Sequence, residues 1–297
     1  MADDPSTLAR LHVPGTGEPT VKRLQSGVSN SSYEVTRDGI RYALRVAEPG
    51  GALMGVDRDW ERRVLQQVQR AQLSPLVECC LPGDGILVTR WVDGVRWTAA
   101  EAASAGKLPT VAGLIRRVHA VRAPVLARTM TPTRWIDLYR RALAQRGAAV
   151  DDRPGAPALP APPALSARAR ELEQVYARFG PRPGVLCHSD LHRHNLIASA
   201  DRLVVLDWEY AHVGDPFWDL AGWMSMNDLP PADAEALLAA YLGRPPRDEE
   251  RARLTVLQWF FDYVGFLWGE LCVAVLGNRL PPDPGDRQRL LLARLMP

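Results

Sequence analysis

One stretch of the sequence places an acid, an amide and a second acid where they could surround a metal ion. Residues 188–195 read HSDLHRHN, and residues 206–209 read LDWE. Asp190 could accept a proton, while Asn195 and Asp207 carry oxygen atoms of the kind that bind a hard cation. A proton acceptor and two oxygen ligands for a cation are what ATP-dependent phosphoryl transfer to an alcohol requires.

The residues between these motifs predict a short β-hairpin that brings them together. Residues 196–198 and 203–206 read as strands, and the polar turn SADR at 199–202 joins them. Pairing of the two strands sets Asn195 opposite Leu206. Asp207 is therefore expected beside Asn195 and within reach of Asp190.

The rest of the chain predicts an α+β fold in which strands come first and helices follow. Alternating apolar residues predict strands at 20–25, 33–36, 40–46 and 86–92. Apolar residues at steps of three and four predict helices at 57–72, 110–122, 134–146 and 166–179. Residues 147–165 are dense in Pro and Ala, which favours a mobile surface loop.

A run of small residues at 26–32 lies between the first two predicted strands. Such residues let backbone N–H groups and hydroxyls approach anionic oxygens, so the run is a candidate phosphate cradle. Its candidate contacts are Ser26, Gly27, Ser29, Asn30 and Ser31. Taken alone, Ser/Asn/Gly runs usually mark turns. The run matches neither the dinucleotide-binding fingerprint nor a Walker A loop.

Together these motifs resemble the catalytic centre of the aminoglycoside phosphotransferase and choline kinase superfamily, which shares the two-lobed protein-kinase fold. The continuation DWEYA at 207–211 and GDPFWDLA at 214–221 is most similar to bacterial choline kinases, and next to thiamine kinases. The resemblance extends from about Leu24 to Leu276. It implies a nucleotide-binding lobe at 1–93, with an antiparallel sheet and a helix, and a mainly helical catalytic and substrate-binding lobe at 94–297.

The resemblance implies that the cofactors are ATP and Mg²⁺ and gives three residues their roles. Asp190 would be the catalytic base, and Asn195 and Asp207 would hold the metal. Without its partners, Asp190 would be better explained as a loop acid that caps a turn. The matching spacing of Asn195 and Asp207 reverses that preference.

Nucleotide contacts are implied in the N-terminal part as well. Arg45, in YALR at 42–45, stands where protein kinases carry a lysine that contacts the phosphates, and Glu61 would be its ion-pair partner. The adenine would meet the hinge backbone at Arg90, Trp91 and Val92. The ordinary alternatives are a solvated helix charge for Glu61 and a plain strand end for the hinge.

The acceptor is predicted to be a small molecule, because only eleven residues separate Asp207 from Asp219, too few for a peptide-holding activation segment. A cationic alcohol is expected from the residues of a later helix. Along the apolar segment 254–276, aromatic and acidic residues share one helical stripe, which suits a quaternary ammonium. An equally weighted alternative is that the aromatics fill the core. The expected acceptor residues are Glu209, Trp259, Asp262, Tyr263, Glu270 and, opposite the stripe, Trp268. By resemblance, Asp219 steadies the catalytic loops.

The stripe does not separate choline from thiamine, and ethanolamine also stays open. Aminoglycosides are polycations, and binding them would require more acidic residues near the site than the sequence shows. His188, His192 and His194 offer a zinc-hydrolase alternative, but their spacing fits no zinc signature. A nucleotide-binding pseudokinase, which would keep the fold without transfer activity, is the alternative from another class.

Composition agrees with an ordinary cytoplasmic enzyme. A net charge of +2 gives no argument for a nucleic-acid partner. Asp262 and Glu270 interrupt the apolar segment, which favours a buried helix over a membrane span. Cys79, Cys80, Cys187 and Cys272 form neither a zinc spacing nor a disulfide framework. The start of the chain lacks the pattern of a signal peptide, and the sequence does not predict the oligomeric state.

Overall fold

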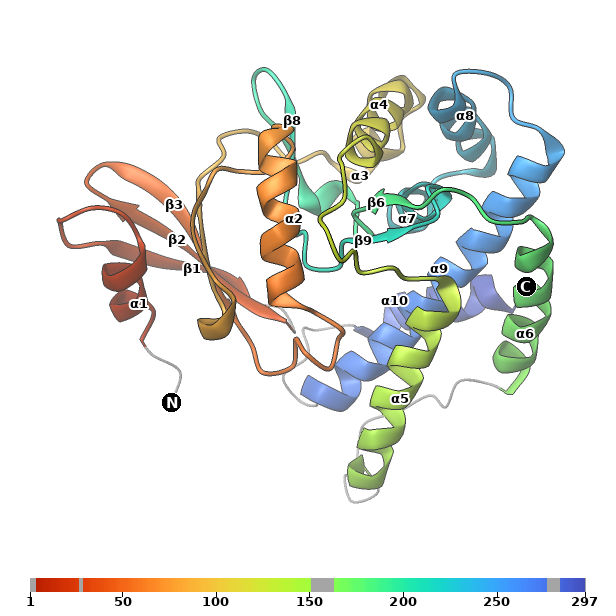
Figure 1. Ribbon diagram of the computed structural model, residues 1–297, viewed down its shortest axis with the longest axis horizontal. Helices are drawn as coiled ribbons and strands as arrows, with labels where there is room; N and C mark the ends of the chain where they lie inside the picture. Colours follow the sequence, from red (N-terminus) through yellow and green to blue (C-terminus); the bar gives the residue numbers. More distant parts are fainter. Residues whose placement is uncertain (1–3, 27–28, 151–162, 277–283, 297) are drawn as a thin grey trace.

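The computed structural model describes residues 4–26, 29–150, 163–276 and 284–296, and places an antiparallel sheet beside a helical part (Figure 1). The sheet has the strand order β1-β2-β3-β5-β4. Its strands are β1 (Thr20–Ser26), β2 (Asn30–Arg37), β3 (Ile40–Ala47), β4 (Val77–Leu81) and β5 (Ile86–Arg90). The predicted turn between β2 and β3 is formed by Asp38 and Gly39, whose φ angles of 50° and 75° suit a tight hairpin.

Each face of the sheet is covered by one helix. Helix α1 (Pro5–His12), which the sequence analysis did not predict, packs its Leu8 and Ala9 against Tyr42 and Leu44 of β3. Helix α2 (Arg58–Arg70) lies between the sheet and the helical part (Figure 1). The alternation of β3 therefore points Tyr42 and Leu44 toward α1, and Arg45 toward α2 and the rest of the molecule.

Helix α2 joins the sheet to the helical part. Asp57 caps its first turn by accepting from the backbone of Trp60 at 2.9 Å. Trp60, Val64, Leu65 and Val68 are buried, as their spacing predicts. The indole of Trp60 also donates to the carbonyl of Ala211 at 2.6 Å, which fixes α2 to the segment that follows the catalytic hairpin.

The helical part carries the predicted catalytic residues on or beside two small antiparallel ribbons. Its helices are α3 (Ala99–Ala103), α4 (Leu108–His119), α5 (Pro132–Val150), α6 (Pro163–Arg178), α7 (Phe217–Met226), α8 (Pro231–Leu242), α9 (Asp248–Leu276) and α10 (Pro284–Leu295). The ribbons pair β6 (Val185–Cys187) with β9 (His212–Gly214), and β7 (Leu196–Ala198) with β8 (Leu203–Val205). Short 3₁₀ turns occur at η1 (Pro82–Asp84), η2 (Ala105–Lys107) and η3 (Arg193–Asn195). The predicted α+β class, with an antiparallel sheet first and helices after it, is confirmed.

Several predicted boundaries shift. Strand β4 was not predicted, and β5 ends at Arg90, so Trp91 and Val92 follow it in irregular backbone. Residues 147–150 belong to α5 and 163–165 to α6, so the predicted Pro/Ala loop is shorter at both ends, and its centre lies outside the described residues. The division at residue 93 stays a prediction.

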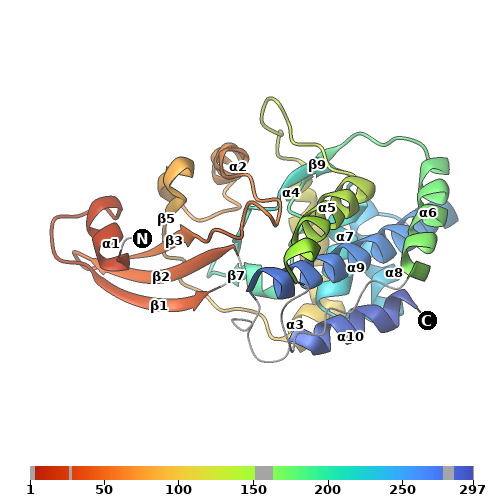
Figure 2. The ribbon, with the colours of Figure 1, turned by 90° about the horizontal axis from the view of Figure 1, so that it is seen from below.

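Helix α9 is the apolar segment of the sequence analysis. Among the described residues it is the one helix long and apolar enough to cross a membrane, and half of its most apolar window is buried inside the fold. It begins beside α8 and runs toward the sheet, packed between α5, α7 and α10 (Figure 2). This is the arrangement of a core helix.

Candidate active site

Both oxygens of the Asp190 carboxylate have a neighbour that fixes their orientation. The amide nitrogen of Asn195 donates to Asp190 Oδ2 at 2.8 Å and to the Asp190 carbonyl at 2.9 Å. His192 Nε2 lies 3.4 Å from Asp190 Oδ1. Because the Asn195 nitrogen is used in this way, its side-chain oxygen is the atom that can serve a cation.

The predicted hairpin brings Asn195 and Asp207 to the same end of a ribbon. Leu196 pairs with Val205, and the Leu206 N–H donates to the Asn195 carbonyl at 2.8 Å. Asp207 follows with a φ of 60°, a left-handed conformation that a non-glycine residue adopts only at a cost. The hairpin register thus explains why these two side chains, twelve positions apart, share one site.

Arg45 links the sheet to this ribbon. Its Nη1 donates to Asp207 Oδ1 at 2.7 Å, and its Nη2 donates to Glu61, which is the predicted ion pair. Removal from water raises the pKa of Asp207 well above its ordinary value, and Glu209 raises it further, while Arg45 opposes the shift. The Asp207 side chain is still 35% exposed, so a cation can reach it.

The Glu209 carboxylate is occupied by bonds to the start of β2 and to α2, so it does not face the expected acceptor. It accepts from Ser29 Oγ at 2.6 Å, Asn30 Nδ2 at 2.8 Å and Arg58 Nη1 at 2.9 Å. Arg58 also donates to Glu61 at 2.9 Å, so acids and bases alternate along one network. The acceptor role predicted for Glu209 does not agree with this position.

The predicted phosphate cradle is therefore only partly open to a nucleotide. Ser29 and Asn30 are bonded to Glu209, and Ser31 Oγ donates to Glu48 at 2.6 Å. Ser26 ends β1, and Gly27 lies outside the described residues.

The Arg90 side chain of the predicted hinge turns toward the sheet. Arg90 pairs with Glu78, and its guanidinium lies 5.0 Å from the ring centroid of Tyr42. The Trp91 N–H donates to the Arg41 carbonyl at 3.1 Å. The Arg90 side chain is thus occupied, and contact of the hinge backbone with an adenine stays a prediction.

A cavity of about 390 Å³ opens beside Asp190 and His192. Its walls come from α5, the segment before β9, α7, α9 and α10. The lining is mostly apolar and includes the aromatic side chains of Trp135, Tyr139, Tyr210, Trp218, Phe261 and Trp268. The Trp268 indole donates to Tyr210 Oη at 3.0 Å, which ties two of these walls together.

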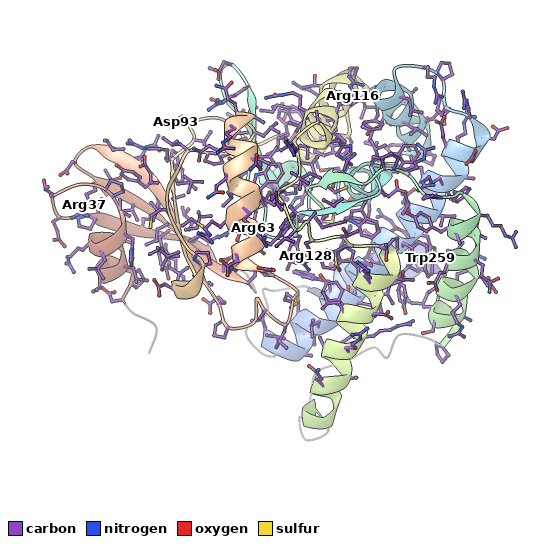
Figure 3. All side chains as sticks on the ribbon, viewed as in Figure 1. Arg37, Arg63, Asp93, Arg116, Arg128 and Trp259 are labelled. Carbon is purple, nitrogen blue, oxygen red and sulfur yellow. The ribbon has the colours of Figure 1, made fainter. Side chains whose placement is uncertain are left out.

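Four of the predicted acceptor residues lie on the other side of α9. Trp259 donates to the Leu295 carbonyl at 3.4 Å, and Tyr263 Oη accepts from Arg140 at 2.8 Å. Asp262 accepts from Ser225, and Glu270 accepts from Gln288 Nε2 at 2.7 Å. Figure 3 shows Trp259 in the half of the helical part that faces α6, away from the sheet.

The reason for this displacement is the geometry of α9. At about 100° per residue, Phe261, Gly265, Trp268 and Cys272 form the stripe opposite to the predicted one, and all four line the cavity. The carboxylates of Asp262 and Glu270 are costly to bury, as expected, but hydroxyl and amide groups of the protein meet that cost. Trp268, predicted in spite of its position opposite the stripe, does line the cavity.

Comparison with known proteins decides the family. The model of the phosphotransferase enzyme family matches residues 20–255. The chain belongs to this family. Protein LicA of Haemophilus influenzae is 29% identical over 110 residues, 35% of this chain and 40% of LicA. The thiamine kinase of Escherichia coli is 40% identical over 62 residues, 20% of this chain and 23% of the enzyme. The matches therefore span less than half of each of these curated relatives.

A likeness in structure extends over the whole fold. Choline kinase LicA from Streptococcus pneumoniae superposes with a TM-score of 0.76 at 19% identity, covering 98% of this chain and 96% of that enzyme. LicA has also been solved in complex with AMP. At this identity the likeness shows the fold alone, and it confirms the predicted α+β, kinase-like fold class.

In this phosphotransferase, Asp219 holds the catalytic loop from behind. Its carboxylate accepts from the backbone N–H groups of His188 and Ser189, at 2.9 and 2.8 Å, and lies 3.1 Å from His119 Nε2. Burial alone would raise the pKa of Asp219, but the bonds from His119 and the loop lower it. Ser189 has a φ of 71°, so the loop is held in a costly conformation. The sequence analysis found no signal at His119, which contacts Asp219 across 100 positions.

The histidines of the loop do not form a zinc site. His188 uses both ring nitrogens, one facing the Leu206 carbonyl at 2.8 Å and one facing the Asp190 N–H at 3.2 Å. Within the described parts of the chain, the one group of three possible ligands within 4.8 Å of each other is His119, Cys187 and Asp219. Since Asp219 is occupied by the loop N–H groups, that cluster is structural.

Proposed function

We propose that this protein transfers a phosphoryl group from ATP, with Mg²⁺, to the hydroxyl of a small cationic alcohol, with choline as the leading acceptor. The observation that carries the proposal is the aromatic cavity that opens beside the Asp190 carboxylate. A base, two oxygen ligands and an acceptor space thus meet at one place.

The donor set fits a divalent cation. The amide oxygen of Asn195 is free for a cation, and the Asp207 carboxylate is partly exposed, so that a bound cation could reach and stabilise it. Asn195 and Asp207 would hold Mg²⁺, which would neutralise charge on the phosphates. Arg45, which reaches Asp207 from the sheet, would orient those phosphates. The fold shared with LicA, solved with AMP, supports a nucleotide on this side.

Asp190 performs the proton transfer in the proposed reaction. The substrate hydroxyl gives its proton to the carboxylate, which Asn195 and His192 hold in one orientation. Asp219 keeps the loop in place through the His188 and Ser189 N–H groups. The aromatic walls exclude water from the hydroxyl as it reacts.

The cavity wall supports a cationic head group on the acceptor. Aromatic faces attract an ammonium by ~0.5–2 kcal/mol each. Among the described residues that line the cavity, Asp190 is the one carboxylate, which disfavours polycationic aminoglycosides. Thiamine, also a cationic alcohol, is the second acceptor, because the thiamine kinase of E. coli matches part of the chain.

Coupled ADP release measures the proposal directly. Purified protein with ATP and Mg²⁺ is given choline, ethanolamine, thiamine or an aminoglycoside, and turnover on choline should exceed turnover on the aminoglycoside. If thiamine is the one alcohol that is turned over, thiamine and not choline is the acceptor. Thermal stabilisation by ATP without turnover on any alcohol would favour the pseudokinase and would contradict the proposal.

A further inference from the structure

A charged side chain lines the acceptor cavity on the wall that α10 contributes. Arg287 is 35% exposed, and its Nη2 lies 3.3 Å from Ser225 Oγ and 3.4 Å from the Ser225 carbonyl, both long contacts. The acid closest to its Nη1 in the described chain is Asp228, at 3.8 Å. Asp228 has a closer partner in Arg294. The charge of Arg287 is therefore only loosely balanced.

The cavity consequently carries opposite charges on different walls. Asp190 is its carboxylate, and Arg287 is the guanidinium among the described lining residues. The pKa of Arg287 is lowered by burial and further by Arg294, with Asp262 and Asp228 opposing, so the protein's own acids do not fully stabilise the cation. A ligand cation placed near Arg287 would be repelled, and a ligand anion would be attracted.

The size of the cavity also favours an acceptor larger than choline. At about 390 Å³ it lies within the range of pockets that hold drug-sized ligands, so a molecule as small as choline leaves part of it unfilled. Gln288 and Leu291 flank Arg287 on the same wall. Helix α10 begins at Pro284, beyond the end of the family match at residue 255. This wall therefore lies outside the residues that the family model matches.

We propose that the preferred acceptor is zwitterionic: besides its hydroxyl and its ammonium group it carries an anionic group, and Arg287 binds that group. The inference rests on the proposed function and narrows its substrate class. A carboxylate suits the planar fork of a guanidinium, which can donate two parallel hydrogen bonds. The aromatic walls would hold the ammonium, and Asp190 would face the hydroxyl.

Two unreactive probes test the binding without any turnover. Tetramethylammonium and glycine betaine share the quaternary ammonium, and betaine adds a carboxylate. Calorimetry should show that betaine binds about tenfold more tightly, because its carboxylate would accept hydrogen bonds from the charged guanidinium of Arg287. Arg287→Gln should abolish that preference without weakening tetramethylammonium, Arg287→Lys should keep part of it, and Arg287→Glu should reverse it.

The control is Arg289→Gln, which removes an exposed arginine from the same helix and should leave both affinities unchanged. A wild-type cavity that binds tetramethylammonium as tightly as betaine, or that binds neither probe, overturns the inference. So does a preference for betaine that survives Arg287→Gln.

Matched alcohols separate this inference from the proposed function. Serine is ethanolamine with an added carboxylate, and trimethylated serine is choline with the same addition. If kcat/KM is higher for the carboxylated alcohol of each pair in wild type, and not in Arg287→Gln, the proposed function and the inference are both supported. Turnover of choline with no such preference sinks the inference alone. Betaine preference without turnover on any alcohol would contradict the proposed function and with it the acceptor, and would leave only the binding of an anionic group by Arg287.

Discussion

The catalytic loop and the acceptor cavity stand side by side but are held together in different ways. Asp190, Asn195 and Asp207 each make a hydrogen bond or an ion pair with another group of the site, and Asp219 fixes the loop beneath them. The cavity walls are mostly apolar surfaces of separate helices. A change in the first region should therefore affect turnover, while a change in the second should affect which acceptor binds, and how tightly.

The largest effect is expected at the proposed base. Asp190→Ala should lower kcat by roughly 10²–10⁴-fold, because the hydroxyl loses its proton acceptor. ATP affinity, measured by calorimetry, should change little. The matched control is Asp201→Ala, which removes an exposed acid in the turn of the same hairpin region and should leave kcat intact. Full turnover in Asp190→Ala would remove the base assignment.

The first region could be predicted from the sequence because its geometry is local. Asn195 and Asp207 are joined by a hairpin whose strand pattern and turn are visible in the residues themselves, and pairing then fixes their relation. Arg45 and Glu61 needed the resemblance to a family, since β3 and α2 meet only in the folded sheet. His119 gave no local signal, because its contact with Asp219 depends on the packing of α4 against the loop.

The second region was harder to predict for a physical reason. Helix α9 is buried on several sides, so an apolar or aromatic stripe does not reveal which neighbour it faces. The stripe chosen from the sequence contacts α5, α7 and α10 through Trp259, Asp262, Tyr263 and Glu270. The stripe that lines the cavity was not predicted, apart from Trp268. Which side of α9 lines the cavity depends on how α5, α7 and α10 pack around it, and these helices lie far apart in the sequence.

A pair of tryptophans on α9 sharpens this comparison. Trp268→Ala should raise the KM for the acceptor about tenfold, because a cation–π contact is worth ~0.5–2 kcal/mol, and should change kcat far less. Trp259→Ala, on the opposite stripe of the same helix, should leave KM unchanged while lowering the free energy of unfolding. Steady-state kinetics measures KM and kcat, and denaturant melts measure the free energy of unfolding. If Trp259→Ala raises KM as much as Trp268→Ala does, the stripe predicted from the sequence contacts the acceptor after all.

The smallest effect is expected at Glu270, whose buried side chain faces Gln288 behind the cavity wall. Burial raises the pKa of Glu270, and the bond from Gln288 opposes that shift. The folded protein then holds this proton more tightly than the unfolded chain, so the contribution of Glu270 to stability falls as the pH rises from the ordinary carboxyl pKa through the raised one. Glu270→Gln cannot ionise, so its stability relative to wild type should increase over that range and then level off, as denaturant melts at a series of pH values would show. A difference that stays constant with pH would mean that Glu270 titrates normally, and a changed kcat would mean that this face of α9 reaches the catalytic loop.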